Sequence, residues 1–267
     1  MNILIIGDIV GSPGRNIMKR ALPKVFPKHD IDYCIANVEN AAGGFGITRD
    51  LCQEFLAMGV DCMTSGNHIW DKREIIPQID SIPELIRPLN YPKEQPGKGT
   101  HIGQGKDSKV PVATLNLSGR VFMNGAMDDP FTLGLAEVEA LRKQAAVIIV
   151  DIHAEASSEK TALAYYLDGK VSAVVGTHTH VPTCDHRILP NGTAYCTDLG
   201  MTGPYDSVIG VEAATIVQRF ITAMPGRFET AKNDPRFAAA VVDVDPKTGR
   251  ARGISRMLLS EKDVDEL

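Results

Sequence analysis

Short apolar segments that alternate with helical patterns are the feature that most constrains the fold of this sequence. The apolar segments end at glycine or polar residues and cover residues 2–8, 32–40, 61–68, 110–119, 145–153 and 171–180. Their length and their content of Ile, Val and Ala are typical of strands buried on both faces of a sheet. Helical patterns that start at serine or threonine cover residues 48–59, 132–144 and 157–169. The alternation predicts an α/β layered fold with a largely parallel central sheet.

The C-terminal part has a different pattern. Two apolar segments, 237–245 and 251–260, flank a turn that contains Pro246 and Gly249, which predicts a β-hairpin. Residues 91–109 are rich in Gly, Pro and Lys and are predicted to form a loop. Because no internal repeat or linker interrupts the pattern, we expect a single domain over residues 1–267.

Composition excludes several classes of partner. A formal net charge of −5 argues against binding of duplex nucleic acid. No apolar run approaches the roughly 20 residues of a membrane span, and the N-terminal run is too short for an export signal. Five cysteines at scattered spacings, with no Cys-x-x-Cys pair, predict free thiols. These features predict a cytoplasmic protein, and they leave homo-oligomerisation open.

Polar side chains follow the predicted strands at the point where each strand ends. Because ligand sites of parallel α/β sheets lie beyond the carboxyl ends of the strands, we expect these side chains to converge. Carboxylates, amides and imidazoles without thiolates suit Fe, Mn, Zn or Co. The donors exceed the needs of one ion but fit two ions that share a carboxylate, an arrangement used in phosphoryl transfer. The converging residues are Asp8, Glu39, Asn40, Asn67, His68, His153, His178 and His180.

Each of these residues alone has a structural explanation. Asp8 is also suited to cap a following helix, Glu39 to form a turn, and His153 to be a hydrogen-bonded core residue. His178 and His180 are expected to share one face of a strand because side chains alternate with a period of two. The joint pattern favours the metal site over the separate explanations.

Six motifs, in this order, resemble the YmdB-type branch of the binuclear metallophosphoesterase (calcineurin-like phosphoesterase) superfamily. They span residues 6–207 and read "IGDIVGSPGR", "ENAAGGFG", "GNHIWDK", "DIHAEASSEK", "GTHTHVPT" and "TDLGMTGPYDS". The resemblance implies a four-layer αββα sandwich of two mixed β-sheets flanked by helices. It also implies two metal ions per chain, with Fe or Mn favoured over Zn or Co.

The resemblance further implies a role for each site residue. Asp8, Asn40 and His180 would bind the first ion; Asn67, His153 and His178 would bind the second; Glu39 would bridge them; and His68 would protonate the leaving oxygen. The usual Asp-x-His opening of the superfamily reads Asp8-Ile9-Val10 here, and its usual bridging aspartate is Glu39. The branch shares both departures, with Asn40 in place of the missing histidine.

The function implied is a dimetal-dependent phosphodiesterase that hydrolyses 2′,3′- or 3′,5′-cyclic nucleotides by attack of a metal-bound hydroxide on phosphorus. The residues alone leave two alternatives open. One is a phosphomonoesterase or nuclease that uses the same site. The other is a non-catalytic regulator that binds a nucleotide or a protein partner there.

Five further residues are weaker candidates. Arg87, Arg120 and Arg187 have the chemistry to reach a substrate phosphate, but no spacing distinguishes them from arginines in surface salt bridges. Asp198 and Glu155 are candidates for orienting the imidazoles of metal ligands.

Overall fold

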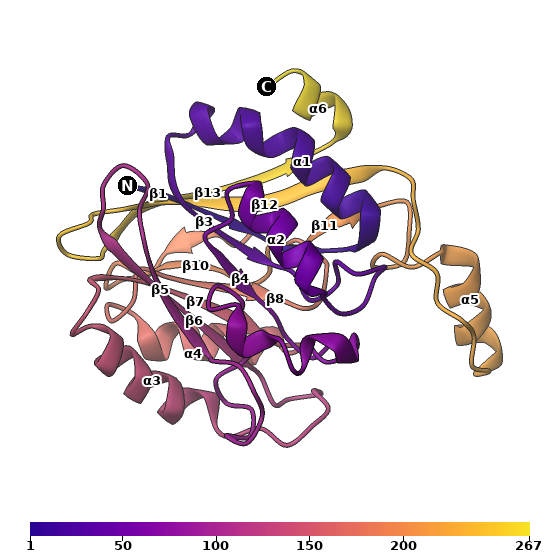
Figure 1. Ribbon diagram of the computed structural model, residues 1–267, viewed down its shortest axis with the longest axis horizontal. Coiled ribbons are helices and arrows are strands. Elements are labelled where there is room, and N and C mark those ends of the chain that lie inside the picture. The colour runs from indigo at the N-terminus through magenta and orange to yellow at the C-terminus, as the bar shows by residue number, and fades with distance from the viewer.

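The computed structural model describes residues 1–267 and contains two mixed β-sheets packed face to face, with helices on both outer faces (Figure 1). This arrangement confirms the four-layer sandwich. No helix is long and apolar enough to cross a membrane, and all five cysteines are free, as expected.

The first sheet combines parallel and antiparallel pairing. Its strands are β1 (Asn2–Ile6), β2 (Asp8–Ile9), β3 (Ile31–Asn37), β4 (Cys62–Thr64), β11 (Met201–Pro204), β12 (Pro235–Val244) and β13 (Ala251–Leu259). Their order is β2-β11-β12-β1-β3-β4, and β13 pairs with β12. Strands β1, β3 and β4 are parallel, while β12 runs antiparallel to β1 and to β13. The predicted hairpin is confirmed as β12 and β13, and it extends this sheet beyond β1.

The second sheet is also mixed. Its strands are β5 (Thr100–Gln104), β6 (Pro111–Ser118), β7 (Val147–His153), β8 (Ala173–Thr177), β9 (Arg187–Ile188) and β10 (Ala194–Cys196). Their order is β5-β6-β7-β8-β10-β9, with β6, β7, β8 and β10 parallel. The prediction of a loop over residues 91–109 is wrong in part, because β5 lies within it. This strand pairs only with β6 at the sheet edge and is partly exposed, so it lacks a buried strand's apolar signature.

The helices form the outer layers. They are α1 (Gly11–Lys28), α2 (Arg49–Ala57), α3 (Pro130–Leu141), α4 (Ser157–Leu167), α5 (Ala213–Thr222) and α6 (Glu261–Asp265), with 3₁₀ turns at Arg73–Ile75 and Ile79–Ser81. Helices α1, α2 and α6 share a core with the first sheet, and α3 and α4 share one with the second. Helix α5 covers neither sheet and projects from the body (Figure 1).

Strand β1 shows how sequence alternation builds the layers. Ile3 and Ile5 enter the core between the two sheets, whereas Leu4 and Ile6 enter the core beneath the helices. This division follows from the two-residue period of a strand. The predicted strand over residues 2–8 is divided at Gly7, where an added Cβ would lie 2.0 Å from the carbonyl oxygen of Gly200. The break lets Asp8 begin β2, which pairs with β11.

Candidate metal centre

All eight predicted site residues lie where the carboxyl ends of strands from the two sheets meet. The residues other than Asp8 end or follow β3, β4, β7 and β8, as predicted. Asp8 was expected at the end of the strand over residues 2–8, but it starts β2 after the break at Gly7. The strands β3 and β4 belong to one sheet and β7 and β8 to the other. The site therefore lies between the two sheets, at the carboxyl ends of these strands. The eight residues are Asp8, Glu39, Asn40, Asn67, His68, His153, His178 and His180.

Asp8, Asn40 and His180 form one group of donors. His180 Nε2 lies 3.8 Å from Asp8 Oδ1 and 3.2 Å from Asn40 Nδ2. Asp8 is fully buried, and its Oδ1 has no hydrogen-bond partner, while its Oδ2 accepts the backbone N–H of His178 at 3.1 Å. Leaving a buried carboxylate oxygen unpaired is costly, so Asp8 Oδ1 indicates that a cation belongs beside it.

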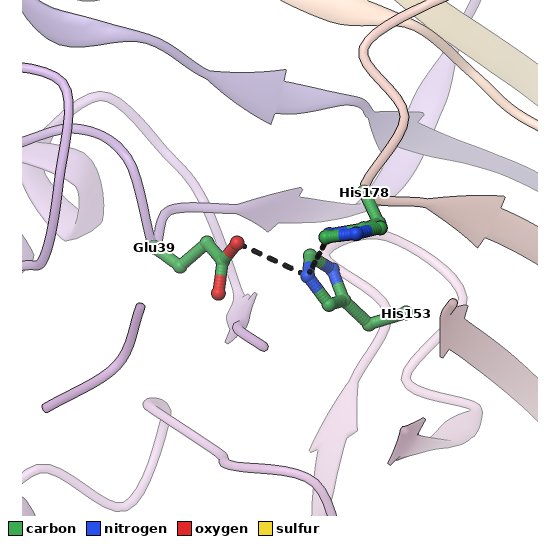
Figure 2. A group of neighbouring side chains, drawn as sticks. All are labelled: Glu39, His153 and His178. Atoms are coloured by element: carbon green, nitrogen blue, oxygen red, sulfur yellow. Dashed lines mark hydrogen bonds and ion pairs between the residues drawn. The ribbon is translucent and has the colours of Figure 1, made fainter. Parts of the chain in front are cut away.

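Asn67, His153 and His178 form the second group, and Glu39 reaches it from the side. Asn67 Oδ1 lies 2.9 Å, Glu39 Oε1 3.1 Å and His178 Nδ1 3.1 Å from the single atom His153 Nε2. Figure 2 shows Glu39, His153 and His178 pointing toward one another; one ligand atom from each lies within 4.8 Å of the other two. One N–H cannot satisfy three acceptors, so this group also fits a cation.

Glu39 connects the two groups. Its Oε1 contacts His153 and lies 3.4 Å from Asn40 Nδ2, and its Oε2 accepts the backbone N–H of His68 at 2.9 Å. The side chain is 1% exposed, so its charge is not screened by water. Glu39 is therefore the carboxylate that contacts both donor groups.

Electrostatics at the centre favour cation binding. Burial, together with the positive charge of His153, lowers the pKa of His178 to about 3, so this imidazole is neutral and keeps a lone pair for a metal. Burial raises the pKa of Asp8. Burial opposes charge on His153 and Glu39 as well, but their attraction for each other prevails, raising the pKa of the imidazole and lowering that of the carboxyl. The proton on His153 thus supplies, next to Glu39, the positive charge that a metal ion held by this group would supply.

Buried partners orient two of the imidazoles, and sequence reasoning missed them. His153 Nδ1 lies 3.0 Å from Thr177 Oγ1, whose hydroxyl donates to Asp151 Oδ1 at 2.8 Å. His180 Nδ1 lies 2.8 Å from the carbonyl oxygen of Ile209, to which it donates. Because Nδ1 of each ring makes this hydrogen bond, Nε2 is the nitrogen that is available to a metal, as is usual for metal-ligating histidines. Asp151 lies two residues before His153 on the same strand, so the period of two was the available signal.

The segment Thr177–His180 is not a regular strand. Strand β8 ends at Thr177, and His178 and His180 have φ angles of 99° and 65°. The prediction that these histidines share a strand face is therefore wrong, although both reach the centre. The left-handed backbone directs the first toward His153 and the second toward Asp8.

A buried ion pair supports this segment from behind. Lys160 Nζ donates to the carbonyl oxygen of Thr177 and to Asp198 Oδ2, both at 2.7 Å. Asp198 Oδ2 also accepts the backbone N–H of Thr179 at 3.2 Å and its hydroxyl at 2.8 Å. Asp198 contacts no imidazole and positions the backbone instead. Glu155 Oε2, by contrast, lies 3.3 Å from His178 Nε2, as expected of an orienting carboxylate.

The centre opens into a cavity of about 600 Å³. Glu39, Asn40, His68, His178 and His180 line its polar side, and residues between 208 and 230 line much of the rest. The three arginines considered from the sequence lie elsewhere. The guanidinium of Arg87 is buried and donates to backbone carbonyls, while Arg120 and Arg187 pair with nearby aspartates. Arg219, which the sequence did not single out, is the only lysine or arginine that lines the cavity.

Comparison with known proteins agrees with this arrangement. A family model described as YmdB-like protein matches residues 4–257. The chain belongs to the YmdB-like family. It is 47% identical over 261 residues to a 2′,3′-cyclic-nucleotide 2′-phosphodiesterase of Bacillus subtilis (strain 168), covering 98% of each chain.

Two solved structures resemble this YmdB-like chain over nearly its whole length. A hypothetical protein from Thermus thermophilus superposes with a TM-score of 0.90 at 41% identity, covering 98% of this chain and 100% of that one. A novel phosphatase from Mycoplasma pneumoniae superposes with a TM-score of 0.91 at 31% identity, covering 97% of this chain and 93% of that one. The fold is thus shared with both of these proteins.

The two departures from the wider superfamily have a structural counterpart in this YmdB-like chain. Val10, at the position of the usual histidine, lines the cavity as an apolar residue, and its backbone N–H donates to Thr202 O at 2.9 Å. Asn40 provides the polar atom beside His180 instead. Glu39 has the longer reach of a glutamate and contacts both donor groups from the loop after β3.

Proposed function

We propose that this protein is a two-metal-ion phosphodiesterase that hydrolyses cyclic nucleotides, with residues 1–267 forming one metallophosphoesterase domain. The observation that carries the proposal is the pair of donor groups joined by Glu39 at the base of an open cavity. Two-metal centres can stabilise both the attacking and the leaving oxygen in phosphoryl transfer. The name of the B. subtilis relative supports a 2′,3′-cyclic nucleotide as substrate, and we extend the proposal to 3′,5′-cyclic forms.

Each donor group would hold one ion. Asp8, Asn40 and His180 would bind the first ion and Asn67, His153 and His178 the second, with Glu39 shared. When bound, the ions, for which we propose Fe or Mn, supply Lewis acidity that activates a water nucleophile and offsets charge on the phosphoryl oxygens. The chain contributes rigidity, because Asp151 and Thr177 fix the His153 ring and Ile209 O fixes the His180 ring.

His68 would deliver the proton that the departing oxygen needs. Its Nδ1 lies 2.8 Å from Asp71 Oδ2 and donates to it, so Nε2 is the nitrogen that can exchange a proton with substrate. The ring contacts Phe45 edge-on, with centroids 5.0 Å apart, and both residues line the cavity. A general acid held in this way contributes about 10²- to 10⁴-fold to rate.

The deciding experiment measures turnover on protein of known metal content. The substrates are 2′,3′- and 3′,5′-cyclic nucleotides, the corresponding monoesters, and single-stranded oligonucleotides. We expect the cyclic diesters to be hydrolysed fastest, and chelation of the metal to abolish turnover. Fast hydrolysis of monoesters alone would assign the site to a phosphomonoesterase, and binding without turnover in any metal form would indicate a regulator.

Variants test the assignment of the site. Glu39→Gln removes the shared charge at nearly constant volume, and we expect loss of metal and of turnover. Glu139→Gln is the matched control, because Glu139 is exposed on α3, and it should retain both. His68→Ala should keep its metal and lose about 100-fold or more in kcat, most of all with poor leaving groups. A Glu39→Gln protein with full metal content and full turnover would refute the proposal.

A further inference from the structure

Helix α5 stands at the end of an arm, residues 206–231, that projects from the body (Figure 1). None of the residues of the helix is buried. The two legs of the arm pair with each other: Val211 bridges to Thr230, and the backbone N–H of Glu212 donates to Glu229 O at 3.0 Å. The arm is therefore an ordered extension of the fold whose helix buries none of its residues against the body.

The base of the arm contacts the metal centre directly. Ile209, in one leg, accepts the hydrogen bond of His180 Nδ1 at 2.8 Å. Thr230, in the other leg, donates its hydroxyl to Gly43 O at 3.1 Å, in the loop that follows Glu39 and Asn40. These contacts hold the arm against His180, a predicted metal ligand, and against the loop that carries two other predicted ligands, Glu39 and Asn40.

Side chains of the arm form the outer wall of the cavity. Ile216, Arg219, Phe220 and Phe228 line it together with the metal-binding residues. The Arg219 guanidinium lies over the Phe228 ring, 4.9 Å from its centroid, and makes no ion pair or hydrogen bond with any side chain. Phe220 is 84% exposed, which is unusual for a phenylalanine that serves only packing. A planar cation and two aromatic rings thus line the same cavity as the predicted metal-binding residues.

We propose that Arg219, Phe220 and Phe228 form a subsite that binds the nucleobase of the substrate by stacking. Guanidinium and aromatic planes stack on nucleobases of any sequence, and the positive charge of Arg219 adds attraction for an anionic nucleotide. Because the wall is continuous with the donor groups, a nucleotide with its phosphate at the centre can place its base against the arm. This inference rests on the proposed function and specifies its substrate class as nucleoside phosphodiesters.

The experiment compares two substrates that share the same scissile ring. One is adenosine 2′,3′-cyclic phosphate, and the other is 1-O-methylribose 2′,3′-cyclic phosphate, which has no base. For the double variant Arg219→Ala/Phe220→Ala, we expect the ratio of the two kcat/KM values to fall about tenfold or more, mainly through the KM of the nucleotide. Calorimetric titration with adenosine 3′-monophosphate and with ribose 5-phosphate should show the same selective loss.

Two controls lie on the same arm. Ile221→Ala removes the neighbouring apolar side chain, which does not line the cavity, and Arg227→Ala removes a cation that does not line it either. Both should keep the wild-type ratio. An unchanged ratio in the double variant, whether or not both kcat/KM values fall equally, would overturn the subsite.

The same experiment separates this inference from its main competitor and from failure of the proposed function. If the exposed face of α5 serves self-association, sedimentation will show a smaller assembly for the double variant with an unchanged ratio, and the subsite is refuted. If the wild-type protein turns over neither substrate, the proposed function fails. The calorimetric comparison of the two monophosphates then still decides whether the arm recognises a base.

Discussion

Replacing Lys160 with methionine should destabilise the protein strongly, although this residue lies outside the cavity. Lys160 is fully buried, and its Nζ donates to Asp198 Oδ2 and to Thr177 O, each at 2.7 Å. Methionine fills a similar volume but provides neither the charge nor the donors. The variant leaves the Asp198 carboxylate, which is 1% exposed, without its counter-ion, and leaves Thr177 O with one partner fewer.

The size of the effect follows from the burial of both partners. Breaking a buried pair by removing one charge costs about 3–5 kcal/mol, since the remaining charge is desolvated and uncompensated. For a chain of this size, each kcal/mol lowers Tm by roughly 2–4 °C, which gives an expected decrease of about 6–20 °C. The double variant Lys160→Met/Asp198→Leu should recover only part of the loss. It removes the unpaired charge, but Asp198 also accepts hydrogen bonds from Thr179 and Gly200.

Urea and thermal unfolding of the metal-free protein are the assays, because bound metal would add its own stabilisation. Lys143→Met is the control: Lys143 is exposed and makes no ion pair, so its replacement should change stability by less than about 0.5 kcal/mol. Metal titration provides a second readout, and we expect weaker binding by Lys160→Met because the Thr177–His180 backbone loses its support. A Lys160→Met protein as stable as Lys143→Met would refute the reasoning.

Three further predictions concern single residues. Gly66→Ala should disrupt the centre, since a Cβ there would lie 2.1 Å from His153 Cδ2, whereas Gly253→Ala, with nothing within 4 Å of the added Cβ, should keep full metal affinity by calorimetry. Asp8→Asn should raise the stability of the metal-free protein by about 1 kcal/mol in urea, because it removes a buried charge with an unpaired oxygen, while abolishing binding of the first ion. Burial raises the pKa of Asp32, but backbone and hydroxyl hydrogen bonds outweigh it and lower the pKa below its usual value near 4. The ionised Asp32 carboxylate therefore stabilises the fold above about pH 4, and this stabilisation is lost as the pH falls through the lower folded-state pKa. The difference in unfolding free energy between wild type and Asp32→Asn should shrink below about pH 4.

The alternation of apolar segments and helical patterns was sufficient to predict an α/β layered fold and a site at the carboxyl ends of its strands. It predicted one largely parallel sheet, whereas the two mixed sheets of the structure were implied only by the family resemblance. Strand β1 illustrates the limit. Its continuous apolar run predicts a strand buried on both faces, and only the structure shows that Ile3 and Ile5 enter one core while Leu4 and Ile6 enter another. The convergence of Asp8 and His178, 170 residues apart, followed from a general property of parallel sheets and needed no knowledge of the contact itself.

Contacts that depend on tertiary packing could not be predicted from the sequence pattern. In the sequence, Lys160 lies in a helical pattern like any surface lysine. Its burial becomes visible only through its ion pair with Asp198, which lies 38 residues further along the chain. Arg219 lies in a helix whose position beside the cavity is set by the two legs of the arm, and no local pattern encodes that position. Strand β5 was missed because an edge strand that is half exposed can contain glycine and polar residues.

The histidines at 178 and 180 show how local strain and function are connected. Non-glycine residues in the left-handed region are disfavoured by about 1–3 kcal/mol each, so two of them within three residues must be held by the surroundings. In a regular strand the two imidazoles would point to the same side. The left-handed backbone sends them to different donor groups, and the Lys160–Asp198 pair behind Thr179 holds it in that form. The buried ion pair thus supports the backbone conformation that separates the two donor groups.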